Sequence, residues 1–159
     1  MFKIKTLGKV ACCLVISFAT TQTALANKNI NALGGCQGFI DFVEKKLSPA
    51  PSKYAAADVQ VVLKGLALLD KHIQQTVINP GFLKFAKGNK AKAQDLHKQL
   101  TVYKKQVATA FQKKHPQHRM FVDFAISLNG CYDTAPLNAA GKAVLEKSVR
   151  MIITLAKKG

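Results

Sequence analysis

Apolar residues recur three and four positions apart over most of this chain, which is the spacing of one face of an α-helix. In the first such segment that face is made by Ile30, Leu33, Cys36, Ile40, Val43 and Leu47, with Phe39 beside it. The run Ser48-Pro49-Ala50-Pro51-Ser52 ends the pattern, because proline cannot continue a helix interior. The spacing therefore predicts a first helix over residues 29–47.

The same spacing predicts a second helix over residues 53–77 and a third over residues 90–114. The core faces are Val59, Val62, Leu66, Leu69, Ile73 and Val77 in one, and Leu96, Leu100, Tyr103, Val107 and Phe111 in the other. Asn79-Pro80-Gly81 is expected to end the second helix. The apolar residues Phe82, Leu83 and Phe85 follow, and they either pack over the end of the bundle or contact a partner.

Pro116 favours the start of a fourth helix, residues 116–129, since proline in a first turn costs no hydrogen bond. That segment is apolar almost all round, which predicts the centre of the bundle. Asn129-Gly130 is expected to end it and to leave Cys131 at a helix terminus. A last helix is predicted over residues 137–157. No convincing strand alternation occurs, so we expect an all-α, single-domain bundle of about five helices.

The beginning of the chain has the pattern of a secretory signal. Lys3, Lys5 and Lys9 precede the apolar run Val10 to Ala19, and Ala24-Leu25-Ala26 provides a cleavage site. The apolar run is too short to span a bilayer. We therefore expect residues 1–26 to be a cleaved signal peptide and residues 27–159 to be one helical domain in the periplasm.

Two cysteines, Cys36 and Cys131, remain after this cleavage. An even pair in an oxidising compartment favours a disulfide, and a redox pair would need the C-x-x-C spacing that is absent here. The sequence thus predicts one disulfide that staples the bundle.

The mature chain would carry 21 basic and 8 acidic residues, a formal charge of +13. Only Arg119 and Arg150 among the basic residues are arginines, whereas nucleic-acid readers favour arginine with interleaved aromatics. The charge instead suits an acidic protein partner or an anionic lipid, or it is simply a solvated lysine-rich surface.

Sequence motifs of catalysis and cofactor binding are missing. There is no C-x-x-C-H, H-E-x-x-H, G-x-S-x-G or P-loop, and the acids show no helix-spaced pair for a carboxylate-bridged metal site. His115 and His118 need not share a face across the predicted helix start, so we expect no metal site there. We predict a protein that is not an enzyme and needs no cofactor.

Two segments resemble a known family. Val102, Gln106, Val107 and Phe111, then His115-Pro116-Gln117-His118-Arg119 and a helix to Cys131, resemble the C-terminal signature of periplasmic helical immunity proteins. Those proteins neutralise amidase effectors of type VI secretion. Cys36-Gln37-Gly38-Phe39-Ile40-Asp41-Phe42-Val43 resembles the Cys-x-Gly-Tyr/Phe-Ile-x-Gly-Val helix of the same family. The resemblance implies a non-enzymatic inhibitor of a peptidoglycan amidase, and these proteins often form dimers.

Lys113, Lys114, His115 and Arg119 are the candidate partner-binding residues, because a helix end and a proline-stiffened turn present them together. The lysine pair also has a structural explanation, since lysine in a last turn complements the helix dipole. Two other functions stay open. One is a periplasmic stress chaperone, and the other is a cofactor-binding bundle of cytochrome type.

Overall fold

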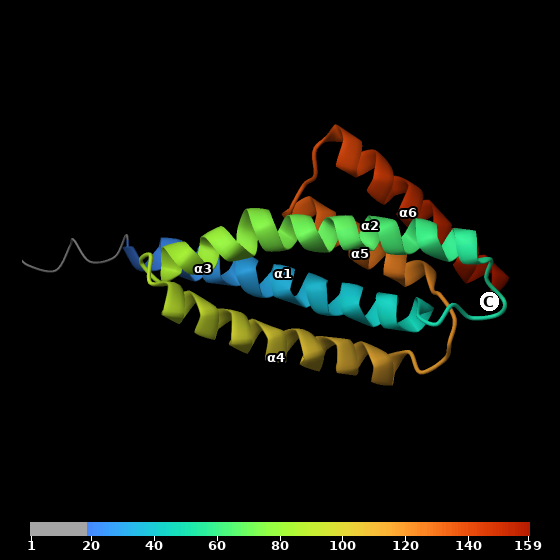
Figure 1. The fold of residues 1–159 in the computed structure, drawn as a ribbon, viewed down its shortest axis with the longest axis horizontal. Coiled ribbons are helices and arrows are strands. Elements are labelled where there is room, and N and C mark those ends of the chain that lie inside the picture. The colour runs from blue at the N-terminus through green and yellow to red at the C-terminus, as the bar shows by residue number, and fades with distance from the viewer. Residues whose placement is uncertain (1–18) are drawn as a thin grey trace, which may run out of the picture.

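The computed structural model describes the backbone of residues 19–159 and the side chains from residue 29 onward. This part of the chain is helical and contains no strand. Its elements are α1 (Ala19–Leu47), α2 (Ala56–Ile73), the π-helical turn η1 (Gln74–Ile78), α3 (Asn79–Phe85), α4 (Lys90–Lys114), α5 (Val122–Thr134) and α6 (Ala139–Lys158). Because α2, η1 and α3 follow one another without interruption, they form one long rod (Figure 1). The predicted all-α bundle of about five helices is confirmed.

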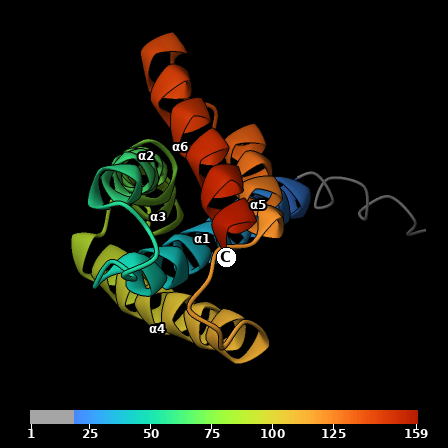
Figure 2. The same cartoon turned by 90° about the vertical axis from the view of Figure 1, so that its right-hand side faces the viewer.

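Helix α1 lies at the centre of this bundle. It contacts α2, α3, α4 and α5, while α6 packs along α2 (Figures 1 and 2). The buried apolar side chains join in one hydrophobic cluster. The prediction that the helix before Cys131 lies at the centre is therefore wrong. On α5, Val122 and Ile126 are 46% and 65% exposed, because α5 is covered on one side only.

Small residues let the helices approach closely in the two most extensive helix pairs, α1–α4 and α2–α6. A Cβ atom on Gly38 of α1 would lie 2.7 Å from the carbonyl oxygen of Lys104 on α4. A Cβ atom on Gly65 of α2 would overlap the side chain of Ser148 on α6. The Ser148 hydroxyl donates to the carbonyl oxygen of Val62 at 2.9 Å, so this buried polar group is satisfied. Side-chain size at these two glycines thus sets the spacing of the α1–α4 and α2–α6 pairs.

The second helix does not end at Asn79-Pro80-Gly81, as the sequence predicts. The chain widens into η1, where the N–H of Asn79 reaches the carbonyl oxygen of Gln74, and it then continues as α3. In a regular helix the proline ring would crowd the carbonyl group four residues before it, and the wider π turn relieves this contact. The rod ends instead at Phe85, and Lys87 and Gly88 in the following turn both have positive φ.

The segment Phe82 to Phe85 shows both features that the sequence left open. Phe82 is buried and its ring packs edge-on against His97 of α4, with 4.8 Å between the ring centroids. Leu83 and Phe85 remain 43% and 57% exposed. The segment therefore packs over the bundle through one side chain and leaves two apolar side chains in solvent.

The fourth helix begins and ends later than predicted. Pro116 lies in a non-helical loop, and α5 starts at Val122. The helix also continues through Gly130 and stops at Thr134, because the next residue, Ala135, precedes Pro136 and is disfavoured in the α conformation. Cys131 therefore lies inside α5 and not at its terminus.

The predicted disulfide between Cys36 and Cys131 is confirmed. The two Cα atoms lie 5.7 Å apart, and the bond joins α1 to α5 across a sequence separation of 95. The disulfide lies on the side of α1 that faces away from α4.

The predicted signal peptide falls mostly outside the described residues. Helix α1 begins at Ala19 and continues without a break past the predicted cleavage site after Ala26. Cleavage and secretion therefore stay predictions. None of the helices in the described part of the chain combines the length and the apolar character that a membrane span requires.

Candidate functional site

The loop of residues 115–121, between α4 and α5, carries the residues that the sequence analysis singled out. Lys113 and Lys114 are exposed in the last turn of α4, and Arg119 is exposed in the loop. His115 is half-buried. The guanidinium carbon of Arg119 lies 4.5 Å from the ring centre of Phe121, and the His115 ring lies 4.9 Å from the same ring. The fold thus brings Arg119 and His115 together around one aromatic side chain.

A buried lysine forms hydrogen bonds with the backbone of this loop. Lys46, in the last turn of α1, is only 4% exposed, and its ammonium group donates to the carbonyl oxygens of His115, at 2.8 Å, and Gln117. The ammonium group also lies 5.2 Å from the centre of the Phe42 ring. Among the described residues no carboxylate pairs with it, so backbone carbonyls and an aromatic face take that role. Burial, reinforced by the nearby charge of Lys53, lowers the pKa of Lys46.

A tyrosine fixes the other end of the loop. The backbone N–H of Met120 donates to the Tyr54 hydroxyl at 2.9 Å, and both residues are buried. Tyr54 belongs to the connection between α1 and α2, so it is remote from the loop in sequence. The hydrogen bonds of Lys46 and Tyr54 together restrict the movement of the loop. We call residues 115–121 the anchored loop.

No protein family, curated protein or solved structure matches this chain. The geometry and charge of the anchored loop are therefore the structural grounds for its interpretation.

His115 sits in an aromatic cluster. Its ring stands edge-on to Phe124 at 5.2 Å between centroids, and it also neighbours Phe42 and Phe111. Burial, then the charges of Lys114 and Lys46, lower the pKa of His115, and Asp123 opposes them weakly. His118 is exposed, so the two histidines occupy different environments.

Sequence analysis missed Lys46 and Tyr54, although the sequence contains a signal for the first. Lys46 follows Phe39 by seven residues and Val43 by three, so it occupies a position of the apolar face of α1. A lysine in that register must either reach solvent or find acceptors inside. Tyr54 gives no comparable signal, because its partner is a backbone group 66 residues away.

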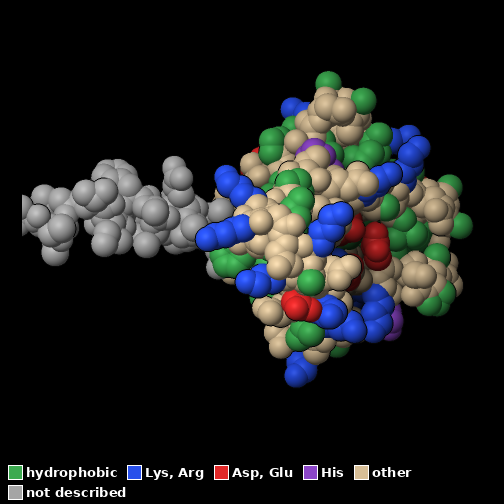
Figure 3. All heavy atoms as spheres, turned by 60° about the vertical axis from the view of Figure 1, so that its left-hand side comes forward, with side chains coloured by type: hydrophobic (Ala, Val, Ile, Leu, Met, Phe, Trp, Pro, Cys, Tyr) green, Lys and Arg blue, Asp and Glu red, His purple; other side chains and the backbone are tan. Residues whose placement is uncertain are grey.

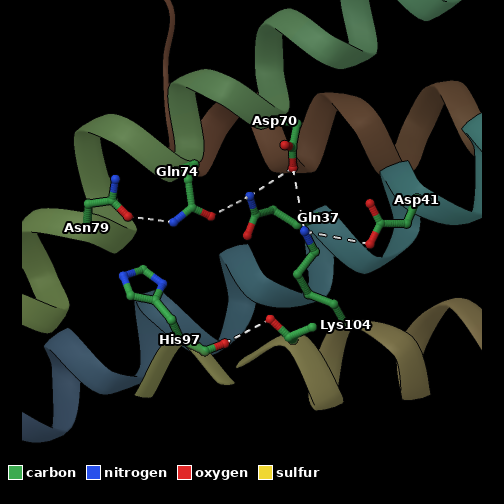
Figure 4. Close-up of polar contacts among 8 residues, drawn as sticks. Gln37, Asp41, Asp70, Gln74, Asn79, His97 and Lys104 are labelled. Atoms are coloured by element: carbon green, nitrogen blue, oxygen red, sulfur yellow. Dashed lines mark hydrogen bonds and ion pairs between the residues drawn. The ribbon is translucent and has the colours of Figure 1, made fainter. Parts of the chain in front are cut away.

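A second polar cluster lies between α1, α2 and α4 (Figure 4). The amide of Gln37, which is fully buried, donates to the carboxylate of Asp70 at 2.8 Å and to the side-chain oxygen of Gln74 at 3.2 Å. Lys104 of α4 lies 3.6 Å from the carboxylate of Asp41 and 3.9 Å from that of Asp70. The side-chain oxygen of Gln37 has no hydrogen-bond partner.

This polar cluster concentrates negative charge in a basic protein. Burial raises the pKa of Asp41 against the opposing charge of Lys104, and burial with the charges of Asp70 and Asp41 raises the pKa of Glu44. The hydrogen bonds and ion pairs link three helices, so we interpret the cluster as a device that fixes their register. The anchored loop is the better candidate for binding, because its Arg119 faces solvent, as do Lys113 and Lys114 directly before it.

Proposed function

We propose that this protein is a periplasmic, non-enzymatic inhibitor that binds a cell-wall amidase, and that the anchored loop is its contact surface. The observation that carries the proposal is the pair of buried anchors, Lys46 and Tyr54, beneath an exposed basic loop. An inhibitor must place side chains in an enzyme's cleft without a large loss of entropy. A loop that is already ordered loses little on binding.

Charge supports the same function. Lys113, Lys114 and Arg119 project from one end of the bundle, and the mature chain would carry a net charge of +13. A positive surface accelerates capture of an acidic partner and favours that partner over others. Arg119 already stacks on Phe121, so its guanidinium is held in position to pair with a carboxylate.

The resemblance of the segments around Cys36 and His115–Arg119 to amidase immunity proteins gives the partner's class. In such a system the producer cell needs a protein that blocks the effector in its own periplasm. The predicted signal peptide would deliver the protein there, and the disulfide suits that oxidising compartment.

The test is co-expression of the protein with a peptidoglycan amidase directed to the periplasm, taken from a neighbouring gene where one exists, followed by measurement of cell lysis and of complex formation. The variant Lys113→Glu/Arg119→Glu should weaken the complex at least tenfold, about 1.4 kcal/mol, and restore lysis. The control Lys64→Glu/Lys147→Glu changes the net charge equally on exposed positions of α2 and α6 and should protect like the wild type. Equal protection by both variants would remove the anchored loop from the interface. Lysis with the wild-type protein would reject the inhibitor itself.

A further inference from the structure

The turn between α3 and α4 forms the end of the bundle opposite the anchored loop. Leu83 and Phe85 are exposed on it, with Lys84 between them. Lys87 follows in the turn, and Lys90 and Lys92 lie in the first turn of α4. We call these six residues the α3–α4 tip. Figure 3 shows basic and hydrophobic side chains interspersed on the face of the molecule that it presents.

Charge at the tip is of one sign. No acidic residue occurs between Asp70 and Asp95. Asp95 lines the same hollow as Phe85, Lys87 and Lys92, and its carboxylate pairs with Lys98 at 3.0 Å. Four exposed lysines therefore surround two exposed apolar side chains without a neutralising partner in the tip itself. This combination is typical of surfaces that insert apolar groups below the headgroups of anionic lipids while lysines contact those headgroups.

The residue types favour lipid over a protein partner. Binding hot spots between proteins are enriched in tryptophan, tyrosine and arginine, and the tip has none of them. The aliphatic stem of a lysine can lie among the lipid chains while its ammonium group stays at the level of the headgroups. Leu83 and Phe85 both lie at the end of α3, and both are exposed at this end of the bundle.

The start of the described part of α1 lies at the same end of the molecule as the tip. A Cβ atom on Gly81 of α3 would lie 2.8 Å from the Cδ1 atom of Ile30, near the start of α1, and the two segments lie side by side in Figure 1.

We propose that the α3–α4 tip binds the surface of membranes rich in anionic phospholipid, with Leu83 and Phe85 inserted and the four lysines on the headgroups. The protein would then work at the membrane surface with the anchored loop directed away from it. This proposal does not depend on the inhibitor function, because the two surfaces lie at opposite ends of α4.

The experiment uses the mature chain, residues 27–159, and co-sedimentation with two kinds of vesicle. One kind contains phosphatidylethanolamine with phosphatidylglycerol, and the other contains phosphatidylcholine alone. We expect retention by the anionic vesicles only, weakened by added salt. Each lysine contributes about a fivefold change in the partition coefficient between vesicle and water. The variant Lys84→Glu/Lys87→Glu should therefore lower this partition coefficient by about 25-fold or more. Leu83→Ser/Phe85→Ser should lower it about tenfold.

Two matched variants are the controls. Lys64→Glu/Lys147→Glu reverses the same number of charges elsewhere, and Ile126→Ser removes an exposed apolar side chain of α5. Both should bind like the wild type. Circular dichroism confirms that each variant is folded. Absence of retention by anionic vesicles, equal retention by both vesicle kinds, or full retention by Leu83→Ser/Phe85→Ser would each overturn the proposal. Amidase inhibition in solution, measured on the same variants, tests the inhibitor function separately.

Discussion

The ammonium group of Lys46 donates to the carbonyl oxygen of His115 at 2.8 Å, although the two residues are 69 positions apart in the sequence. This hydrogen bond joins the last turn of α1 to the residue that ends α4. It also places the only buried lysine of the described residues directly beneath the proposed contact surface. The stability of the core and the shape of the anchored loop therefore depend on one side chain.

We expect Lys46→Met to destabilise the protein and to loosen the anchored loop. Methionine keeps the length of the side chain but leaves the carbonyls of His115 and Gln117 without their donor. The loss of charged hydrogen bonds, partly offset by removal of a buried charge, should lower the free energy of unfolding by about 1–3 kcal/mol. Hydrogen exchange should show faster exchange of the Arg119 and Met120 amides.

The neighbouring Lys45 provides the control for this prediction. It is exposed in the same turn of α1, so Lys45→Met should change stability by less than about 0.5 kcal/mol. If Lys46→Met leaves both stability and exchange unchanged, the loop is held by other contacts.

Gly65→Ala should destabilise the α2–α6 pair. The new methyl group would overlap Ser148, whose hydroxyl is bonded to Val62, so the helices must separate at a cost of about 1–3 kcal/mol. Urea unfolding measures this change. Gly130→Ala is the matched control, because nothing lies within 4 Å of its added Cβ atom and the position is helical. Alanine there should stabilise the protein by about 0.5–1 kcal/mol. Equal effects at both positions would contradict the close packing.

Removal of the disulfide should lower stability without changing the helical content. The bond closes a separation of 95 residues. The chain-entropy treatment gives about 4–5 kcal/mol for a loop of this size, and measured losses are about 2–5 kcal/mol. The double variant Cys36→Ser/Cys131→Ser avoids a free thiol, and its urea midpoint should equal that of the reduced wild-type protein. A midpoint equal to that of the oxidised protein would mean that packing alone holds α5 on α1.

Acid should weaken the fold through His115. Burial lowers its pKa in the folded state, so the unfolded chain takes up this proton first as the pH falls. The stability contributed by neutral His115 is present above about pH 6.5 and is lost as the pH falls through the lowered folded pKa. A single group changes stability by at most about 1.4 kcal/mol per pH unit.

The variant His115→Phe keeps an aromatic ring in the cluster and removes the titration. Urea midpoints between about pH 7.5 and about pH 5 should fall more steeply for the wild type than for this variant. His118→Phe, at an exposed position, should follow the wild type. The raised pKa values of Asp41 and Glu44 act in the opposite direction, because those groups stabilise the fold as the pH falls. They are present in all three proteins, so the comparison isolates His115. A wild type that exposes apolar surface on acidification would favour the chaperone function.

Local signals in the sequence were enough for most of the fold. The bounds of α4, residues 90–114, agree with the prediction, because Asn89 caps its first turn and Pro116 follows its end. The end of α1 is likewise fixed by the prolines after Leu47. The disulfide followed from the number of cysteines and the predicted compartment, since only one pairing of Cys36 and Cys131 exists.

Tertiary structure decided what local signals could not. Pro80 does not end its helix, because the π turn and the packing of Phe82 let the rod continue to Phe85. Pro116 does not start a helix, because Lys46 and Tyr54 form hydrogen bonds with the loop backbone and keep it in a non-helical conformation. The hydrogen bonds of Lys46 and Tyr54 join residues more than 60 positions apart, and a helical period reports only on neighbours within a turn or two. The sequence alone therefore determined where apolar faces exist, and the packing of those faces determined which basic residues stand together in solvent.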